Sequence, residues 1–89
     1  MTEFTIQNNP AAQRFETIVE GHLAKLDYQI KDGRLQIDYV YVPPESRGRG
    51  LGGALVEAAV AWAKQEGLKT YPLCGFARGY LRQHPELED

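Results

Sequence analysis

The chain has 89 residues and a mass of 10.0 kDa, which leaves room for one domain with a modest core. Ten basic and twelve acidic residues argue against a general nucleic-acid binder, which usually carries a basic excess. No apolar run approaches the about 20 residues of a membrane helix, and no signal-peptide pattern is present. One cysteine excludes an internal disulfide, and only two distant histidines disfavour a zinc site. We therefore expect one cytoplasmic α/β domain over residues 1–89 that binds no metal, nucleic acid or membrane.

The first half of the chain has the alternating pattern of strands. Residues 1–12 contain the loop signal Asn8-Asn9-Pro10, so we expect them to be loosely held. Apolar and polar residues then alternate over three segments, 14–20, 23–31 and 35–42. Asp32-Gly33 is typical of a two-residue hairpin turn, and two prolines end the third segment. The pattern predicts a three-stranded antiparallel meander.

The second half changes to a helical period. Apolar residues from Leu51 to Trp62 recur at spacings of three and four, and the alanine-rich segment 53–66 stops at Gly67. A short strand is predicted over 69–73 and a second helix over 76–82, before Pro85. The acidic residues 87–89 are expected to fray. The predicted order is β-β-β-α-β-α, a small α/β (α+β) fold.

A glycine-rich turn, Arg47–Gly53, lies between the predicted third strand and the first helix. It contains four glycines: Gly48, Gly50, Gly52 and Gly53. Glycine lets the backbone approach a ligand closely, and the first N–H groups of a helix lack partners within the helix. Such a turn favours phosphate or pyrophosphate, and Arg47 and Arg49 add positive charge. The structural alternative is a tight strand-to-helix turn, which needs only one or two glycines and no arginines.

Two common phosphate-binding motifs fit this turn poorly. A Walker loop requires Lys and then Ser or Thr after its last glycine, whereas Ala54 and Leu55 follow Gly53. A dinucleotide fingerprint would follow a strand directly and would be followed by an acidic residue roughly 20 positions later. Here prolines intervene upstream, and Lys69-Thr70-Tyr71 occupies the downstream place.

A third motif fits better. Residues 47–52, Arg-Gly-Arg-Gly-Leu-Gly, match the R-x-x-G-x-G signature of the GNAT superfamily of N-acetyltransferases. When this signature is combined with Pro72-Leu73-Cys74 and His84-Pro85-Glu86, the chain resembles the miniature single-domain branch of that superfamily. The resemblance extends from about residue 15 to residue 86. The resemblance implies a minimal acyl-CoA N-acyltransferase fold with a mainly antiparallel sheet, and acetyl-CoA (coenzyme A) as co-substrate.

The resemblance also implies a binding mode for acetyl-CoA. Its pyrophosphate would rest on the backbone N–H groups of Gly48, Arg49, Gly50, Leu51, Gly52 and Gly53, with Arg47 at the rim. Its pantetheine arm would pair with the edge of residues 39–42, which include Tyr41 and Val42. The acetyl thioester would then lie between Val42 and Cys74.

Cys74 and Tyr80 are the candidate catalytic side chains. Cys74 is open to three roles: nucleophile in an acetyl relay, acid for the leaving sulfur, or small buried residue at a strand end. Tyr80 is a candidate acid, although aromatic residues at helical spacing, such as Phe76 and Tyr80, more often pack in a core. Members of the miniature branch often carry an acid where this chain has Tyr41, and we place Asp38 on the opposite strand face, from which it cannot replace that acid.

The predicted function is N-acetyl transfer from acetyl-CoA to a primary amine. The chain has no room for the N-terminal helices that form the acceptor site of larger relatives, so an open cleft should favour an exposed amine on a protein or a polyamine. The alternatives are a non-catalytic coenzyme A binder or sensor, which Tyr41 favours, and an interaction module that keeps only the fold. Exposed strand edges allow a monomer or a weak homodimer.

Overall fold

The computed structural model describes residues 4–88. Five strands and two α-helices follow one another in the order β1 (Gln7–Asn9), β2 (Arg14–Val19), β3 (His22–Lys31), β4 (Arg34–Tyr41), α1 (Leu51–Gln65), β5 (Lys69–Pro72) and α2 (Gly75–Gln83). Two short 3-10 helices cover Pro44–Ser46 and Pro85–Glu88. The predicted α/β class and element order are therefore confirmed, with one strand more than expected.

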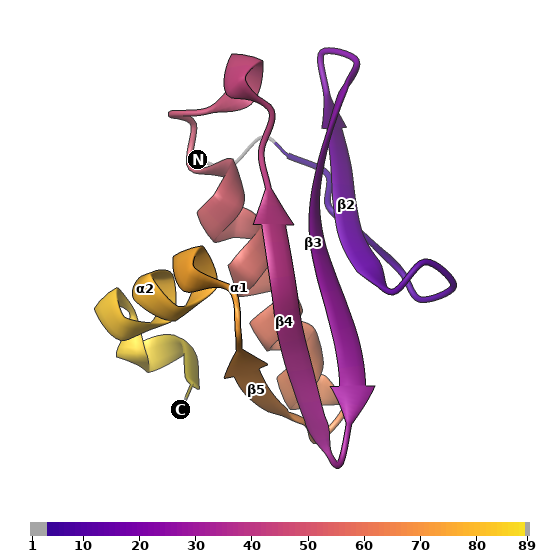
Figure 1. Ribbon diagram of the computed structural model, residues 1–89, viewed down its shortest axis with the longest axis vertical. Helices are drawn as coiled ribbons and strands as arrows, with labels where there is room; N and C mark the ends of the chain where they lie inside the picture. Colours follow the sequence, from indigo (N-terminus) through magenta and orange to yellow (C-terminus); the bar gives the residue numbers. More distant parts are fainter. Residues whose placement is uncertain (1–3, 89) are drawn as a thin grey trace.

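The strands form a single sheet in the order β1-β2-β3-β4-β5, in which only β4 and β5 run parallel. Figure 1 shows the long antiparallel strands β3 and β4 at its centre and the short β5 beside β4. The Asp32-Gly33 turn joins β3 to β4, and both residues have the positive φ angles (53° and 76°) of a two-residue hairpin turn. Glu20 and Gly21 (52° and 80°) form a similar turn between β2 and β3.

Short elements of regular structure lie within both end segments, 1–12 and 87–89. β1 lies inside the segment 1–12 that we expected to be loose, because its short polar run pairs with β2. In the tail 87–89, residues 87 and 88 belong to the last 3-10 helix, and Leu87 packs against the core. Met1–Glu3 and Asp89 lie outside the described residues.

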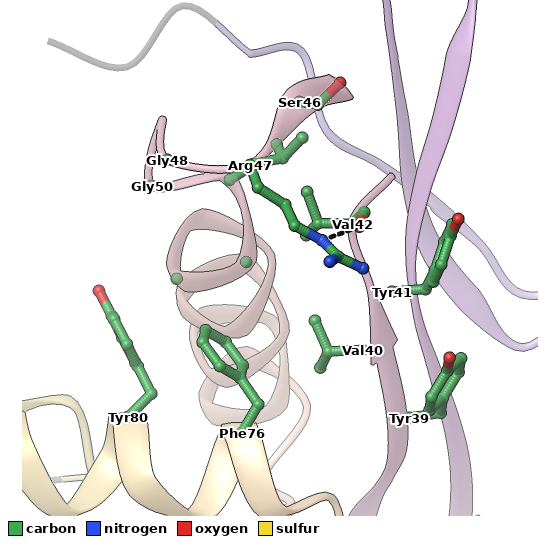
Figure 2. Close-up of a pocket in the computed structure, with 13 residues that line it drawn as sticks. Tyr39, Val40, Tyr41, Val42, Ser46, Arg47, Gly48, Gly50, Phe76 and Tyr80 are labelled. Atoms are coloured by element: carbon green, nitrogen blue, oxygen red, sulfur yellow. Dashed lines mark hydrogen bonds between the residues drawn. The ribbon is translucent and has the colours of Figure 1, made fainter. Parts of the chain in front are cut away.

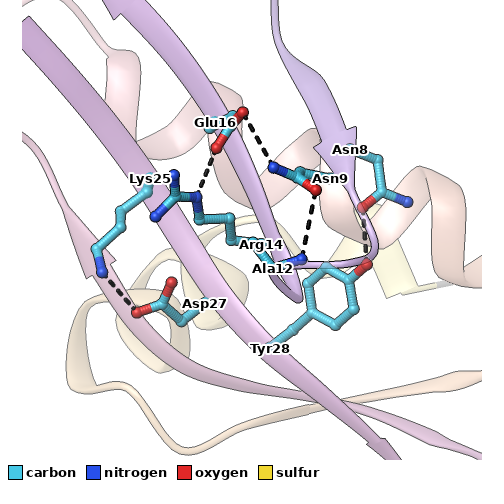
Figure 3. Close-up of polar contacts among 8 residues, drawn as sticks. All are labelled: Asn8, Asn9, Ala12, Arg14, Glu16, Lys25, Asp27 and Tyr28. Atoms are coloured by element: carbon cyan, nitrogen blue, oxygen red, sulfur yellow. Dashed lines mark hydrogen bonds and ion pairs between the residues drawn. The ribbon is translucent and has the colours of Figure 1, made fainter.

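The core lies between one face of the sheet and the helices. The largest buried side chains come from β3, β4 and α1, and α2 adds two buried residues. The set includes Leu26, Leu35, Ile37, Leu51, Leu55 and Val56, with Ala77 and Leu81 from α2. At one end of this core, the rings of Phe15, Tyr28 and Trp62 pack against one another at centroid distances of 5.5–5.9 Å. The opposite face of the sheet carries polar pairs, which include Arg14–Glu16 and Lys25–Asp27 (Figure 3).

A β-bulge interrupts β4 at Asp38. Tyr28 pairs with Ile37 whereas Asp27 pairs with Tyr39, so Asp38 is an extra residue on β4. The buried set therefore changes phase, from Leu35 and Ile37 before the bulge to Val40 and Val42 after it. Asp38 bonds to Gln29 on the polar face, where Lys25 also lies over Tyr39. Our placement of Asp38 on the strand face opposite Tyr41 was wrong, because the bulge brings both residues to the polar face.

Candidate functional site

A cleft of about 600 Å³ lies where the end of β4, the glycine-rich turn and α2 meet. Figure 2 shows its two walls, with the end of β4 facing the aromatic side chains of α2 across the first turns of α1. Thirteen residues line it: Tyr39, Val40, Tyr41, Val42, Ser46, Arg47, Gly48, Gly50, Leu51, Gly52, Gly53, Phe76 and Tyr80. Most of the residues that the sequence assigned to coenzyme A binding are thus brought together, but Arg49 is not among the lining residues. Cys74, a candidate catalytic residue, does not line the cleft either.

One wall of the cleft is the free edge of β4. β5 pairs with β4 only over residues 34–37, and the N–H groups of Leu73 and Cys74 both donate to the Ile37 carbonyl, at 2.9 and 3.1 Å. β4 then continues to Tyr41 while the chain beyond β5 turns into α2 (Figure 1). This part of the strand edge is open to an extended ligand that adds to the sheet.

The side chains of this wall point alternately to the two sides of the edge. Val40 and Val42 point toward the helices, whereas Tyr39 and Tyr41 point away from them (Figure 2). All four residues line the cleft. The cleft therefore follows the strand edge itself and is reached from both faces of the sheet.

The four glycines of the turn have two different structural roles. Gly48 and Gly50 have φ angles of +86° and +78°, in the left-handed region that glycine adopts without strain. Gly52 and Gly53 lie beneath the rings of α2, so that a Cβ on Gly52 would approach Phe76 Cζ to 2.8 Å. A Cβ on Gly53 would approach Tyr80 Cε1 to 2.5 Å. All four glycines thus have a steric reason that needs no ligand, whereas the sequence predicts only one or two for a tight turn.

The glycine-rich turn also leaves backbone donors free. Gly50 is the N-cap of α1, and its own carbonyl accepts from Ala54 N at 3.0 Å. Among residues 4–88, no protein oxygen accepts a hydrogen bond from the N–H groups of residues 48–53. Four of these donors, on residues 50–53, lie at the positive end of a 15-residue helix and two lie in the turn before it, an arrangement suited to an anion.

The two arginines of the turn lie in different places. Arg47 lines the cleft, where its Nε donates to the Val42 carbonyl at 2.9 Å and its guanidinium projects between β4 and α1 (Figure 2). Arg49 points away and pairs with Glu20 at 3.3 Å, beside a different hollow of the surface. Only Arg47 is therefore positioned to add positive charge inside the cleft.

Tyr80 and Cys74 differ in their relation to the cleft. Tyr80 lines it, and the Tyr80 hydroxyl donates a hydrogen bond to Glu57 of α1. This bond, together with burial and the charges of Glu57 and Glu86, raises the pKa of Tyr80 to about 12. Cys74 is half-buried, packs against the core and forms the N-cap of α2. No carboxylate, imidazole or thiol is among the lining residues described.

The comparison with known proteins identifies the family. A family model described as GCN5-related N-acetyltransferase matches residues 14–89. The chain belongs to this family. Its fold is similar to the solution structure of a GCN5-like protein from Staphylococcus aureus, with a TM-score of 0.77 and 26% sequence identity. The similarity covers 100% of this chain and 88% of that chain, and no curated protein matches this chain in sequence.

The GCN5-related membership confirms the resemblance that the glycine signature predicted, and the structural similarity confirms the fold class. Within the part of the chain that the structure describes, neither α-helix is long and apolar enough to span a bilayer. Over the same residues, no three potential metal ligands gather at one place.

Sequence reasoning missed two lining residues of this N-acetyltransferase domain, Ser46 and Phe76. We expected Phe76 to be core, yet its side chain is 49% exposed and stacks on Tyr80 at a centroid distance of 6.0 Å. The available signal was the pair Gly52-Gly53, since adjacent glycines at a helix start leave space for a bulky side chain to pack over them. Nothing in the local sequence pointed to Ser46, which is buried in the 3-10 helix before the turn.

Proposed function

We propose that this chain binds acetyl-CoA in the cleft and transfers the acetyl group to a primary amine. The observation that carries this proposal is the continuity of the cleft, which joins the unpaired edge of β4 to the glycine-rich turn, where five of the six free N–H donors belong to lining residues. An extended amide-bearing arm suits the strand edge, and a pyrophosphate suits the helix start. Membership of the GCN5-related N-acetyltransferase family supports the same ligand.

The chemistry is an exchange at the thioester carbonyl. The neutral amine nitrogen attacks the carbonyl carbon, the C–S bond breaks as the C–N bond forms, and coenzyme A leaves as the thiolate. The nitrogen loses one proton, and the thiolate takes up one proton through solvent. Backbone N–H groups near Val42 are candidates to polarise the carbonyl oxygen in this step. The Tyr80 hydroxyl is a weak proton donor here, because its pKa is raised to about 12.

A second candidate function is binding of coenzyme A without turnover. The absence of a carboxylate or imidazole from the described lining residues favours it, since such groups commonly remove the amine proton. Both candidates require the same cofactor site, so binding and turnover must be measured separately.

Thermal unfolding with and without acetyl-CoA tests the binding site, with NAD and ATP as control ligands. A ligand at a hundred times its dissociation constant stabilises the folded state by about 2.7 kcal/mol. For a domain of this size each kcal/mol shifts the melting temperature by about 4–8 °C, so we expect a rise of at least about 10 °C. No rise at millimolar acetyl-CoA would contradict both candidate functions.

Release of free coenzyme A thiol then separates the two candidates. Amine-dependent thiol release, above the rate of thioester hydrolysis without amine, would support acetyl transfer. A stable complex with acetyl-CoA that releases no thiol with lysine peptides, monoamines or polyamines would favour the non-catalytic binder.

A further inference from the structure

Asp38 is an oriented carboxylate on the polar face of the sheet. The bulge makes it an extra residue on β4, immediately before the part of the strand that lines the cleft. One carboxylate oxygen accepts from Gln29 Nε2 at 2.7 Å, and the other accepts from Gln36 Nε2 at 2.8 Å. These two amide donors fix the direction of the carboxylate without neutralising its charge.

The charge of Asp38 differs from that of its acidic neighbours on this face. Glu16 is paired with Arg14, and Asp27 is paired with Lys25 at 3.0 Å (Figure 3). Among the ion pairs of residues 4–88, none includes Asp38. Asp38 therefore differs from Glu16 and Asp27 in having no ion pair within the described residues, and it lies just before the part of β4 that lines the cleft.

Aromatic rings lie next to this charge. Tyr39 follows Asp38 directly, is 50% exposed and stacks on Tyr41 at a centroid distance of 6.4 Å. The ammonium group of Lys25 lies 5.9 Å from the centre of the Tyr39 ring, so a ligand ammonium group would share this ring with Lys25 or take its place. A carboxylate beside exposed tyrosine rings attracts an alkylammonium ion in preference to a neutral or anionic group.

We propose that Asp38, with Tyr39, selects an acceptor that carries a second positive charge, a small alkyl diamine or polyamine. One ammonium group binds at the Asp38 carboxylate on the polar face, and the other amine, in its neutral form, enters the cleft around the free edge of β4. This inference rests on the proposed function and adds the substrate class.

The test compares two amines of equal carbon length, putrescine and n-butylamine, in the thiol-release assay. The variants are Asp38→Asn, which removes the charge and keeps the shape, and Asp32→Asn in the distant β3–β4 turn. Asp32→Asn is the control, because it changes the net charge by the same amount as Asp38→Asn. Asparagine also tolerates the positive φ of residue 32. We expect Asp38→Asn to raise the KM for putrescine about tenfold and to leave kcat and the KM for n-butylamine within about twofold. Asp32→Asn should match the wild type.

Calorimetric binding of putrescine to the protein saturated with coenzyme A makes this inference separable from the proposed function. Tight putrescine binding that weakens about tenfold in Asp38→Asn would support the amine site even if no amine released thiol. Equal affinity of wild type and Asp38→Asn for putrescine would overturn the role of Asp38, whether or not turnover occurs. Thiol release that is faster with n-butylamine or a neutral-flanked lysine peptide than with putrescine would also overturn it.

Discussion

Gly53 is the position at which an added methyl group has the most direct consequence. A Cβ there would lie 2.5 Å from Tyr80 Cε1 and 2.9 Å from its hydroxyl oxygen, so Gly53→Ala must displace the ring. Alanine is favoured over glycine in a helix by about 1 kcal/mol, whereas overpacking costs about 1–3 kcal/mol. We expect a net loss of about 1 kcal/mol in the free energy of unfolding, or about 4–8 °C in the melting temperature.

Gly79→Ala is the matched control for this prediction. Gly79 lies within α2, has no left-handed φ and has no atom within 4 Å of its Cβ position. The same substitution should therefore raise the unfolding free energy by about 1 kcal/mol. The two variants would then differ by about 2 kcal/mol in thermal or urea unfolding followed by circular dichroism.

A double-mutant cycle locates the cause. In a Tyr80→Ala background the clash is absent, so Gly53→Ala should become stabilising, with a coupling energy of about 1–3 kcal/mol between the two sites. If Gly53→Ala raised the melting temperature as much as Gly79→Ala does, the ring of Tyr80 would not lie over the start of α1, and the reasoning about the cleft wall would be refuted.

Three further predictions concern the cleft. Arg47→Ala should weaken acetyl-CoA binding about tenfold in calorimetry. Arg49→Ala should change the affinity less than twofold, because the exposed ion pair of Arg49 lies outside the cleft. Equal losses of affinity would contradict the placement of the two arginines. Because the folded-state pKa of Tyr80 is raised from 10.0 to about 12, its stabilising effect is present below about pH 10 and is lost as the pH rises through about 12. Tyr80→Phe should therefore show a smaller alkaline loss of stability in urea unfolding, and an unchanged alkaline profile would count against the hydrogen bond to Glu57. Cys74→Ala should keep kcat within about twofold, because Cys74 does not line the cleft. It should cost about 1 kcal/mol in the free energy of unfolding, because Cys74 packs against the core. Loss of coenzyme A thiol release in this variant would favour the acetyl relay instead.

The sequence predicted the long elements of this fold within one or two residues, because their signals are local. Alternation marks β2, β3 and β4, the Asp32-Gly33 turn fixes one hairpin, and Gly67 stops α1 with a φ of +72°. β1 was missed because its three polar residues carry no periodic signal and depend on pairing with β2. Tertiary pairing, and not local propensity, decides that strand.

The bulge was missed although the sequence carried a sign of it. Apolar residues in β4 occupy odd positions at Leu35 and Ile37, and then even positions at Val40 and Val42. A regular strand cannot place both pairs on one face, so one extra residue must lie between them. Strict alternation, which we applied to the whole segment, placed Asp38 on the wrong face and hid its relation to the aromatic residues beside the cleft.

The glycine-rich turn shows why residue counts alone were not sufficient for the site. Four glycines suggested a phosphate site, yet the structure gives each a steric reason that holds without a ligand, two in backbone angle and two in packing against α2. The six N–H groups of residues 48–53, for which the described residues provide no acceptor, are what favours an anion at this turn. The two roles are linked, because the missing side chains of Gly52 and Gly53 let Phe76 and Tyr80 form the wall that faces the free edge of β4. A substitution at Gly53 should therefore weaken folding and acetyl-CoA binding together, whereas Gly79→Ala should leave binding unchanged.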